Sequence, residues 1–170
     1  MGKKKVPVPA VLGGMEVREI LRVVCNDGIL YSIVCALRGP DLTNSEPLKN
    51  TFTWPIRWIA SGDEDPVGVI LGYVTAGNVI MAIYTLPFIE GEVEHYLSHV
   101  YSAYRSLYEI EVIPKDIFEY VRECIEVVKK ISEMLRSGVS FEDIDVDSYT
   151  EPIVRLYKDL CEKYKVNERG

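Results

Sequence analysis

The sequence predicts a mainly α-helical protein with one domain, and three observations support this fold class. A chain of 170 residues suffices for a single domain with a substantial core, but it is too short for two domains of ordinary size. From Glu90 onward, apolar residues recur every three or four positions, the spacing of amphipathic helices. Ile113-Pro114 and Ser137-Gly138 divide this part of the chain into separate helices. We expect residues 15–170 to form one helical domain, and a single β-hairpin near residues 67–86 remains an open alternative within it.

The N-terminal part of the chain predicts an extended arm followed by apolar elements. Residues 1–14 form the arm, because two prolines and Gly13-Gly14 disfavour a helix. Residues 16–25 have the apolar spacing of a short helix. The continuous apolar run 29–37 fits a buried strand and a buried helix equally well, because periodicity cannot separate the two.

A polar loop over residues 39–50 leads to the next predicted helix, which covers residues 51–60. Thr53 is the expected N-cap of this helix, because Pro55 is best tolerated in a first turn.

The chain from Asp65 to Glu90 is the hardest to assign, because no residue between these two is charged. The stretch is long enough to span a bilayer, and Gly68-x-x-x-Gly72 matches a packing motif of membrane helices. The acidic flanks and the lack of a basic anchor argue against a span. Gly77-Asn78 separates two halves rich in β-branched residues, which favours a hairpin. Two short buried helices remain the other alternative.

A long helix over residues 115–137 is the predicted spine of the domain. Its apolar residues follow a coiled-coil type of spacing, at Ile117, Val121, Cys124, Val128, Ile131 and Leu135. Such a seam packs within one chain or between two chains, so it also suggests a homo-oligomer. The last helix is expected to start near Thr150, with Pro152 in its first turn.

Composition excludes some classes of function and favours a cytoplasmic protein. The net charge of −7 argues against nonspecific binding to nucleic acid, which needs a basic surface. The basic run Lys3-Lys4-Lys5 is followed by Val6-Pro7-Val8-Pro9, which is not the apolar run of a signal peptide. The four cysteines lack a Cys-x-x-Cys pair, as expected of reduced thiols. We expect neither a membrane nor a nucleic acid as partner, and the composition is typical of a thermophile.

His95 and His99, the only histidines, lie four residues apart in a predicted helix. With Glu92 they fall within an arc of about 60° on one polar stripe. Two imidazole nitrogens and one carboxylate at this spacing could hold a divalent metal, or could serve general acid–base chemistry. The alternative is an exposed polar helix face without chemistry.

The second candidate site is a basic loop. Arg38 and Asp41 flank Gly39-Pro40, and Lys49 and Arg57 follow. The three cations could converge on a phosphate or a carboxylate, with Asp41 orienting Arg38 or binding a metal. The alternative is a structural turn with local ion pairs. The sequence has no P-loop, dinucleotide-binding glycine motif, nucleophile elbow or zinc-type cysteine spacing.

Four short motifs resemble a set of small uncharacterised proteins from phages and archaeal viruses: Arg38-Gly39-Pro40-Asp41, Leu48-Lys49, Thr53-x-x-Ile56-Arg57 and His95-Tyr96-x-x-His99. The resemblance implies an origin in a virus or mobile element and supplies no activity. It also implies that the basic loop and the histidine helix belong to one site.

The function predicted from sequence is that of a small intracellular binding or assembly protein that self-associates. The alternative is a metal- or phosphate-dependent enzyme, in which the basic loop binds the anion and the histidine helix binds the metal. The sequence indicates no cofactor other than this candidate divalent metal.

Overall fold

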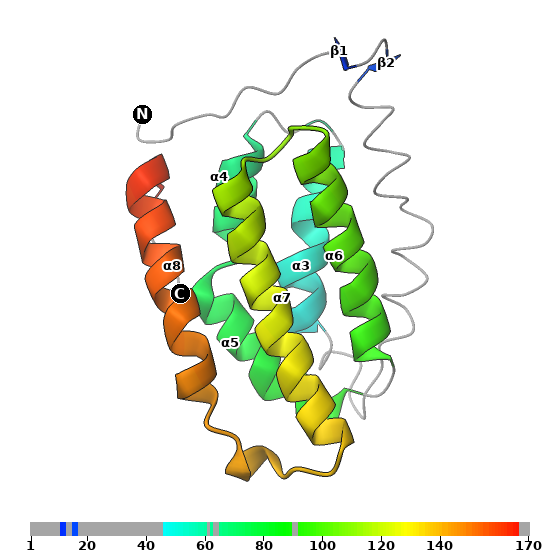
Figure 1. Ribbon diagram of the computed structural model, residues 1–170, viewed down its shortest axis with the longest axis vertical. Helices are drawn as coiled ribbons and strands as arrows, with labels where there is room; N and C mark the ends of the chain where they lie inside the picture. Colours follow the sequence, from blue (N-terminus) through cyan, green and yellow to red (C-terminus); the bar gives the residue numbers. More distant parts are fainter. Residues whose placement is uncertain are drawn as a thin grey trace.

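The computed structural model describes residues 11–12, 15–16, 46–60, 62, 65–89 and 92–166. Within these ranges the chain is mainly helical, which confirms the predicted fold class (Figure 1). The predicted elements over 16–25 and 29–37, and most of the arm, lie outside the described residues.

Six α-helices and two 3₁₀ turns make up the described part of the domain, preceded by a short antiparallel pair of strands. Their bounds are β1 (Val11–Leu12), β2 (Met15–Glu16), α3 (Glu46–Ala60), α4 (Pro66–Tyr73), α5 (Ala76–Thr85), η2 (Leu86–Phe88), α6 (Val93–Glu109), α7 (Lys115–Arg136), η3 (Phe141–Asp143) and α8 (Val146–Tyr164). In Figure 1, α6, α7 and α8 run up, down and up in front, and α3, α4 and α5 lie behind them. The core lies between these two layers.

Helix α7 is the central helix of the front layer and matches the predicted spine of the domain. Its seam is buried inside this chain, against α6 on one side and α8 on the other. Five of the six predicted seam residues are inaccessible to solvent, namely Ile117, Val121, Cys124, Val128 and Ile131. The seam therefore supplies core packing within the chain, and it no longer serves as an argument for self-association.

The predicted hairpin near residues 67–86 is wrong, because this stretch forms helices α4 and α5. Each helix has a side-chain N-cap: Asp65 Oδ1 accepts from Gly68 N at 3.1 Å, and Thr75 Oγ1 accepts from Asn78 N at 2.9 Å. Gly77-Asn78 therefore lies in the first turn of α5, not in a hairpin turn. The β-branched residues stay helical because burial on the core outweighs their preference for strands.

The local structure accounts for the glycine at position 68 without a membrane. A Cβ atom at this position would come within 2.2 Å of the Asp65 carboxylate, so any other residue there would make the capping side chain shift. Among the described residues no single helix is long and apolar enough to cross a bilayer. Helix α4 and the segment formed by α5 and η2 are long and apolar enough to span a bilayer only when they are taken together, and a bend of 47° separates them.

The break between α4 and α5 is a buried polar junction. A helix end leaves carbonyl groups without partners inside the helix, and burying them unpaired is costly. Four carbonyls at this end have partners, and three of the donors are side chains from other elements: Val74 N donates to Ile70 O, Tyr157 Oη to Leu71 O, Asn78 Nδ2 to Tyr73 O and Tyr120 Oη to Val74 O. We call this set of carbonyls and donors the α4–α5 junction.

Two tyrosines of the front layer thus hold the junction from α7 and α8. The distances are 2.6 Å from Tyr120 Oη to Val74 O and 2.8 Å from Tyr157 Oη to Leu71 O. Burial raises the pKa of the Tyr120 hydroxyl well above its usual value, which keeps the hydroxyl protonated and able to donate. The junction joins the two layers by hydrogen bonds as well as by apolar packing.

Two predicted helix starts were also wrong, because both prolines lie inside longer helices. Helix α3 begins at Glu46, so Thr53 is a buried interior residue instead of the N-cap. Helix α8 begins at Val146, because Asp145 accepts from Ser148 N at 3.3 Å and caps it there. Pro55 and Pro152 each remove one helical hydrogen bond, which the packing of the long helices tolerates.

Removing either tyrosine hydroxyl at the junction should destabilise the fold. We expect Tyr120→Phe and Tyr157→Phe each to lower the free energy of unfolding by about 1–3 kcal/mol, because each leaves a buried carbonyl without a donor. Urea unfolding followed by circular dichroism measures the change. Tyr108→Phe is the matched control, since that half-buried ring stacks on Phe118 away from the junction. If Tyr120→Phe and Tyr157→Phe lower the free energy of unfolding no more than Tyr108→Phe does, the hydroxyl groups do not stabilise the junction.

Candidate functional site

The largest exposed apolar side chains of the rear layer gather on α3, α5 and η2. In the described part of the chain, the exposed fractions are 39% for Trp54, 46% for Trp58, 57% for Met81, 51% for Tyr84 and 56% for Phe88. The first two come from α3, and the last three are spaced along one side of α5 and η2. Trp54, Trp58 and Met81 line one groove together with Tyr73 of α4, and we call these four residues the aromatic face; Tyr84 instead packs on Phe141 of η3, with ring centroids 5.3 Å apart.

The tryptophans of α3 are exposed because the core takes the other side of this helix. The buried side chains of α3 include Leu48, Phe52 and Ile56, which recur every four residues. Trp54 and Trp58 follow the same spacing on a different stripe. Exposure of both indoles is thus fixed by the register of the helix, not by a loose end of the chain.

Hydrogen bonds and ring contacts hold the two indoles in place. Trp54 Nε1 donates to Asn50 Oδ1 at 2.7 Å, and Trp58 Nε1 donates to Tyr73 Oη at 3.2 Å. The ring centroids of Trp54 and Trp58 are 6.4 Å apart with a tilt of 31°. The Arg57 guanidinium carbon lies 5.2 Å from the centroid of the Trp54 ring, which is cation–π contact. These contacts restrict the movement of both rings at the surface.

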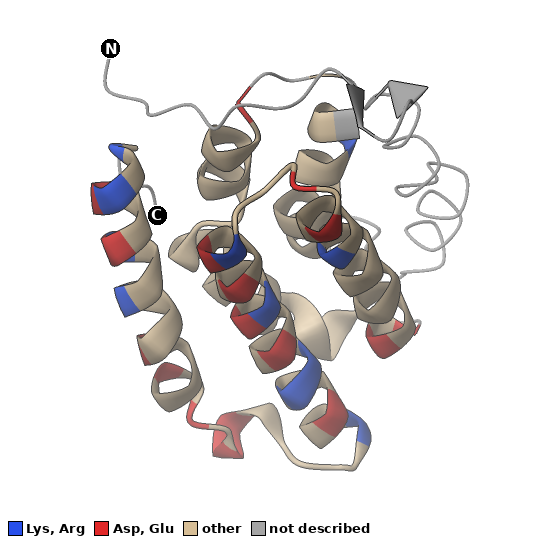
Figure 2. Ribbon diagram, turned by 45° about the horizontal axis from the view of Figure 1, so that its top comes forward, with Lys and Arg blue, Asp and Glu red and all other residues tan. Residues whose placement is uncertain are grey.

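A groove of about 660 Å³ runs between α3, α4 and α5 at the base of these rings. Its nine lining residues include Trp54, Trp58, Gly72, Tyr73 and Met81, and none of the nine is charged. Gly72 adds space, because even a Cβ atom there would meet nothing within 4 Å. Figure 2 shows the same neutrality along α4 and α5, whose ribbons carry no charged residue, whereas α6, α7 and α8 carry many.

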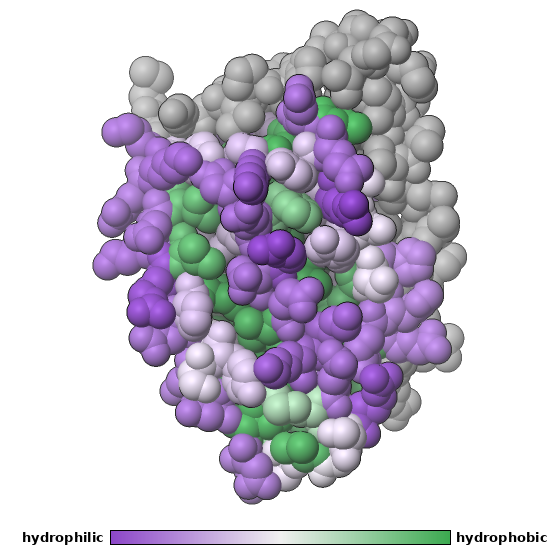
Figure 3. Space-filling view, in the orientation of Figure 1, coloured by the Kyte–Doolittle hydropathy of each residue, from purple (hydrophilic) through white to green (hydrophobic). Residues whose placement is uncertain are grey.

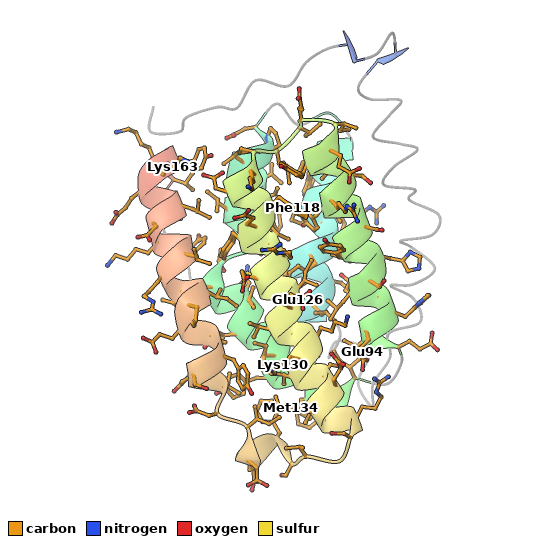
Figure 4. All side chains as sticks on the ribbon, viewed as in Figure 1. Glu94, Phe118, Glu126, Lys130, Met134 and Lys163 are labelled. Atoms are coloured by element: carbon orange, nitrogen blue, oxygen red, sulfur yellow. The ribbon has the colours of Figure 1, made fainter. Side chains whose placement is uncertain are left out.

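The front layer has a different surface. Figure 3 shows it as mostly hydrophilic, with hydrophobic side chains in narrow strips between the helices. A second groove of about 860 Å³ lies along α7, where Glu126, Lys130 and Met134 point outward (Figure 4). It is lined by side chains of both charges, and the Lys130 ammonium lies 5.6 Å from the centre of the Tyr149 ring. This mixture is typical of a solvated surface.

A polar contact between α6 and α7 also belongs to the front layer. Glu94 Oε2 accepts from Ser132 Oγ at 3.2 Å (Figure 4). Arg136 Nη2 lies 3.0 Å from Glu94 Oε1, close enough for an ion pair but without hydrogen-bond geometry. The contact links α6 to α7 and helps to fix how these two helices pack.

The predicted histidine pair lies together on α6. The ring centroids of His95 and His99 are 4.6 Å apart and nearly perpendicular, at 80°. His95 is exposed and His99 half-buried, while Glu92 sits at the N-cap of the helix. In the part of the chain that the structure describes, no three His, Cys, Asp or Glu side chains form a set that could hold a metal ion. The pair can therefore offer two ring nitrogens to a ligand from one helix face.

Half of the predicted basic loop can be placed. Lys49, Thr53 and Arg57 are spaced four apart on α3, and the Thr53 hydroxyl is hydrogen-bonded to the Tyr96 hydroxyl of α6 at 2.5 Å. Lys49 and Arg57 thus lie one turn to each side of a contact with the histidine helix. Arg38 and Asp41 lie outside the described residues. Convergence of all the candidates on one site remains a prediction.

The aromatic face is the feature that the sequence analysis missed. Its signal was present, because two tryptophans four residues apart in a helix, off the stripe of Leu48, Phe52 and Ile56, point away from the core. The choice between a hairpin and two short helices for residues 67–86 stayed open, and this hid the rest, because Tyr73 and Met81 come together with α3 only when the stretch is helical.

Comparison of the chain with protein-family models, with curated proteins and with solved structures found no match. The resemblance to proteins of phages and archaeal viruses therefore stays a prediction, and the functional argument depends on the surface of the molecule.

Proposed function

We propose that this protein is a small binding and assembly protein that self-associates through the aromatic face. The observation that carries the proposal is the exposure of both tryptophans beside an uncharged groove. Tryptophan and tyrosine are the residues that most often dominate the energy of protein interfaces.

The size of the face supports an interface between proteins. Trp54, Trp58 and Met81 are each about half exposed, and Tyr73 is half-buried beside them. A large aromatic side chain buries roughly 150–250 Å² when covered, so the face offers roughly 300 Å² of apolar surface. A stable interface buries about 800 Å² on each partner, and an apolar patch of this size on a monomer is often functional. The face would form the apolar centre of such an interface.

The charge of the chain favours a second copy as the partner. With a net charge of −7, two copies repel each other across most of their surfaces. The groove and helices α4 and α5 carry no charge, so pairing there brings no carboxylates together. A two-fold dimer pairs one patch with itself, and a neutral apolar patch meets that requirement.

The proposed setting is the cytoplasm, with an origin in an archaeal virus or another mobile element and adaptation to heat. Cys124 and Cys161, the cysteines that the structure describes, are buried thiols outside any disulfide, as expected in a reducing compartment. The origin depends on the four short motifs, and heat adaptation depends on composition.

A charge placed in the aromatic face should prevent association. We expect Trp58→Glu to weaken the dimer by at least about 100-fold, because two-fold pairing would bury one added carboxylate from each copy without a partner. Sedimentation velocity over a range of concentrations measures this change. Leu156→Glu on α8 is the matched control, since Leu156 is 38% exposed and lies on the opposite layer.

Two results would contradict self-association through this face. One is a parent protein that stays monomeric at several hundred micromolar. The other is a Trp58→Glu variant that associates as well as the parent does. A monomeric parent that instead sediments with neutral phosphatidylcholine vesicles would assign the face to a lipid surface.

A second candidate function is metal binding by the histidine pair, within the alternative of a metal- or phosphate-dependent enzyme. The specific observation is the 4.6 Å separation of the His95 and His99 rings on one helix face. Two imidazoles at this spacing can bind one divalent ion, with water completing the set. Lys49 and Arg57, near the same helix, would attract an anionic substrate, with Arg38 and Asp41 from the preceding loop.

Metal titration tests this second candidate. We expect Zn²⁺ to bind the parent in isothermal titration calorimetry, and His95→Ala and His99→Ala each to weaken binding by at least about tenfold, because one ligand is lost from a small set. Ser102→Ala on the same polar stripe is the control. If the parent and the three variants give equal heats of binding, His95 and His99 do not bind the metal and are only part of an exposed polar face.

A further inference from the structure

The groove beside the tryptophans has the chemistry of a site for a proline-containing segment. Grooves lined by aromatic rings bind extended proline-rich chains, because a proline ring is a rigid apolar plate that packs on an indole or phenol. The walls here are the rings of Trp54, Trp58 and Tyr73, and the floor is widened by Gly72. The volume of about 660 Å³ suits a few residues of extended chain.

The spacing of the two indoles matches the axial separation of two prolines in such a chain. In the polyproline II conformation each residue advances about 3.1 Å and three residues make one turn, so two prolines separated by one residue lie about 6.2 Å apart along the chain, on two adjacent edges of it. The centroids of Trp54 and Trp58 are 6.4 Å apart. With these two edges facing the groove, a Pro-x-Pro segment can bring one proline ring toward each indole.

The chain itself contains one segment with this pattern. Val6-Pro7-Val8-Pro9 has two prolines separated by one residue. We propose that the groove of one copy binds the Val6–Pro9 segment of a second copy. This inference deepens the proposed function and rests on it, since it names the segment that one copy presents to the aromatic face of another.

Charge favours this occupant. No residue from Val6 to Met15 is charged, so an uncharged segment meets an uncharged groove and no charge has to be buried. Lys3-Lys4-Lys5 directly precedes the segment, and the rest of the chain is more acidic than the net charge of −7. The basic run would thus draw the arm toward a second, acidic copy.

Exchange between two copies also explains why assembly would stop at a dimer. Each copy offers one segment and one groove, so reciprocal exchange fills both grooves and leaves neither segment unused. The arms add binding to that of the apolar face, because the second arm docks within an existing complex.

A mixing experiment tests the exchange. Pro7→Ser with Pro9→Ser gives a variant without the proline rings, and Trp54→Ala gives a variant with a damaged groove. We expect each alone to dimerise at least about tenfold more weakly than the parent. An equimolar mixture should recover much of the loss, because the intact arm of one variant can enter the intact groove of the other. Pro152→Ala, at an exposed proline of α8, is the control and should match the parent.

Each other outcome overturns the inference and leaves the proposed function separately testable. A Pro7→Ser, Pro9→Ser variant that dimerises like the parent shows that the arm does not fill the groove, and Trp58→Glu then still tests the face. Weak dimerisation of both variants without recovery on mixing shows that the segment acts within its own chain. A monomeric parent removes the inference together with the proposed function.

Discussion

The buried carbonyl end of helix α4 is the constraint on which the rest of this structure depends. A helix that ends inside the core must find donors for its last carbonyl groups, because water is excluded there. In this chain Tyr120 of α7 and Tyr157 of α8 reach across the core to Val74 O and Leu71 O. The front layer can pack on the rear layer only where these hydrogen bonds form, so the junction selects one arrangement of the helices.

The junction also positions the groove, because the same residues serve both. The Tyr73 carbonyl accepts from the Asn78 side chain, while the Tyr73 hydroxyl receives the hydrogen bond of the Trp58 indole. Asn78 in turn lines the groove. The bend between α4 and α5 thus brings α4 and α5 against the same side of α3 and leaves an apolar surface there uncovered. The exposure of this surface thus follows from the way in which the buried carbonyl groups of the junction find their hydrogen-bond donors.

The sequence predicted the front layer well and the rear layer poorly, for physical reasons. Helices α6 and α7 have one buried face each, so their apolar spacing is clear, and α7 matched its predicted bounds closely. Helices α4 and α5 lack charged residues, and their β-branched residues resemble strands. Their helical state depends on the Asp65 and Thr75 caps and on hydroxyl groups from Tyr120 and Tyr157. These two tyrosines are too distant in the sequence for any local pattern to include them. Long-range contacts decided this part of the fold.

The candidate sites also divide into one that local sequence could predict and one that depends on contacts between distant elements. The histidine pair could be predicted because both residues lie on one helix, and the structure places their rings side by side. The aromatic face combines residues from α3, α4 and α5, so its members were visible in the sequence but their proximity was not. A surface built from several elements becomes predictable only after the elements are assigned correctly.

Intrinsic tryptophan fluorescence tests the central claim most directly, because both tryptophans of the chain lie in the aromatic face. In a single copy Trp54 and Trp58 are 39% and 46% exposed, so association through this face must remove water from both rings. Dilution of the unmodified protein from several hundred micromolar to nanomolar concentration should shift the emission maximum to longer wavelength, with the midpoint of the shift where the mass falls from dimer to monomer. An emission maximum that stays constant while the mass changes would contradict the account, because the copies would then associate through another surface.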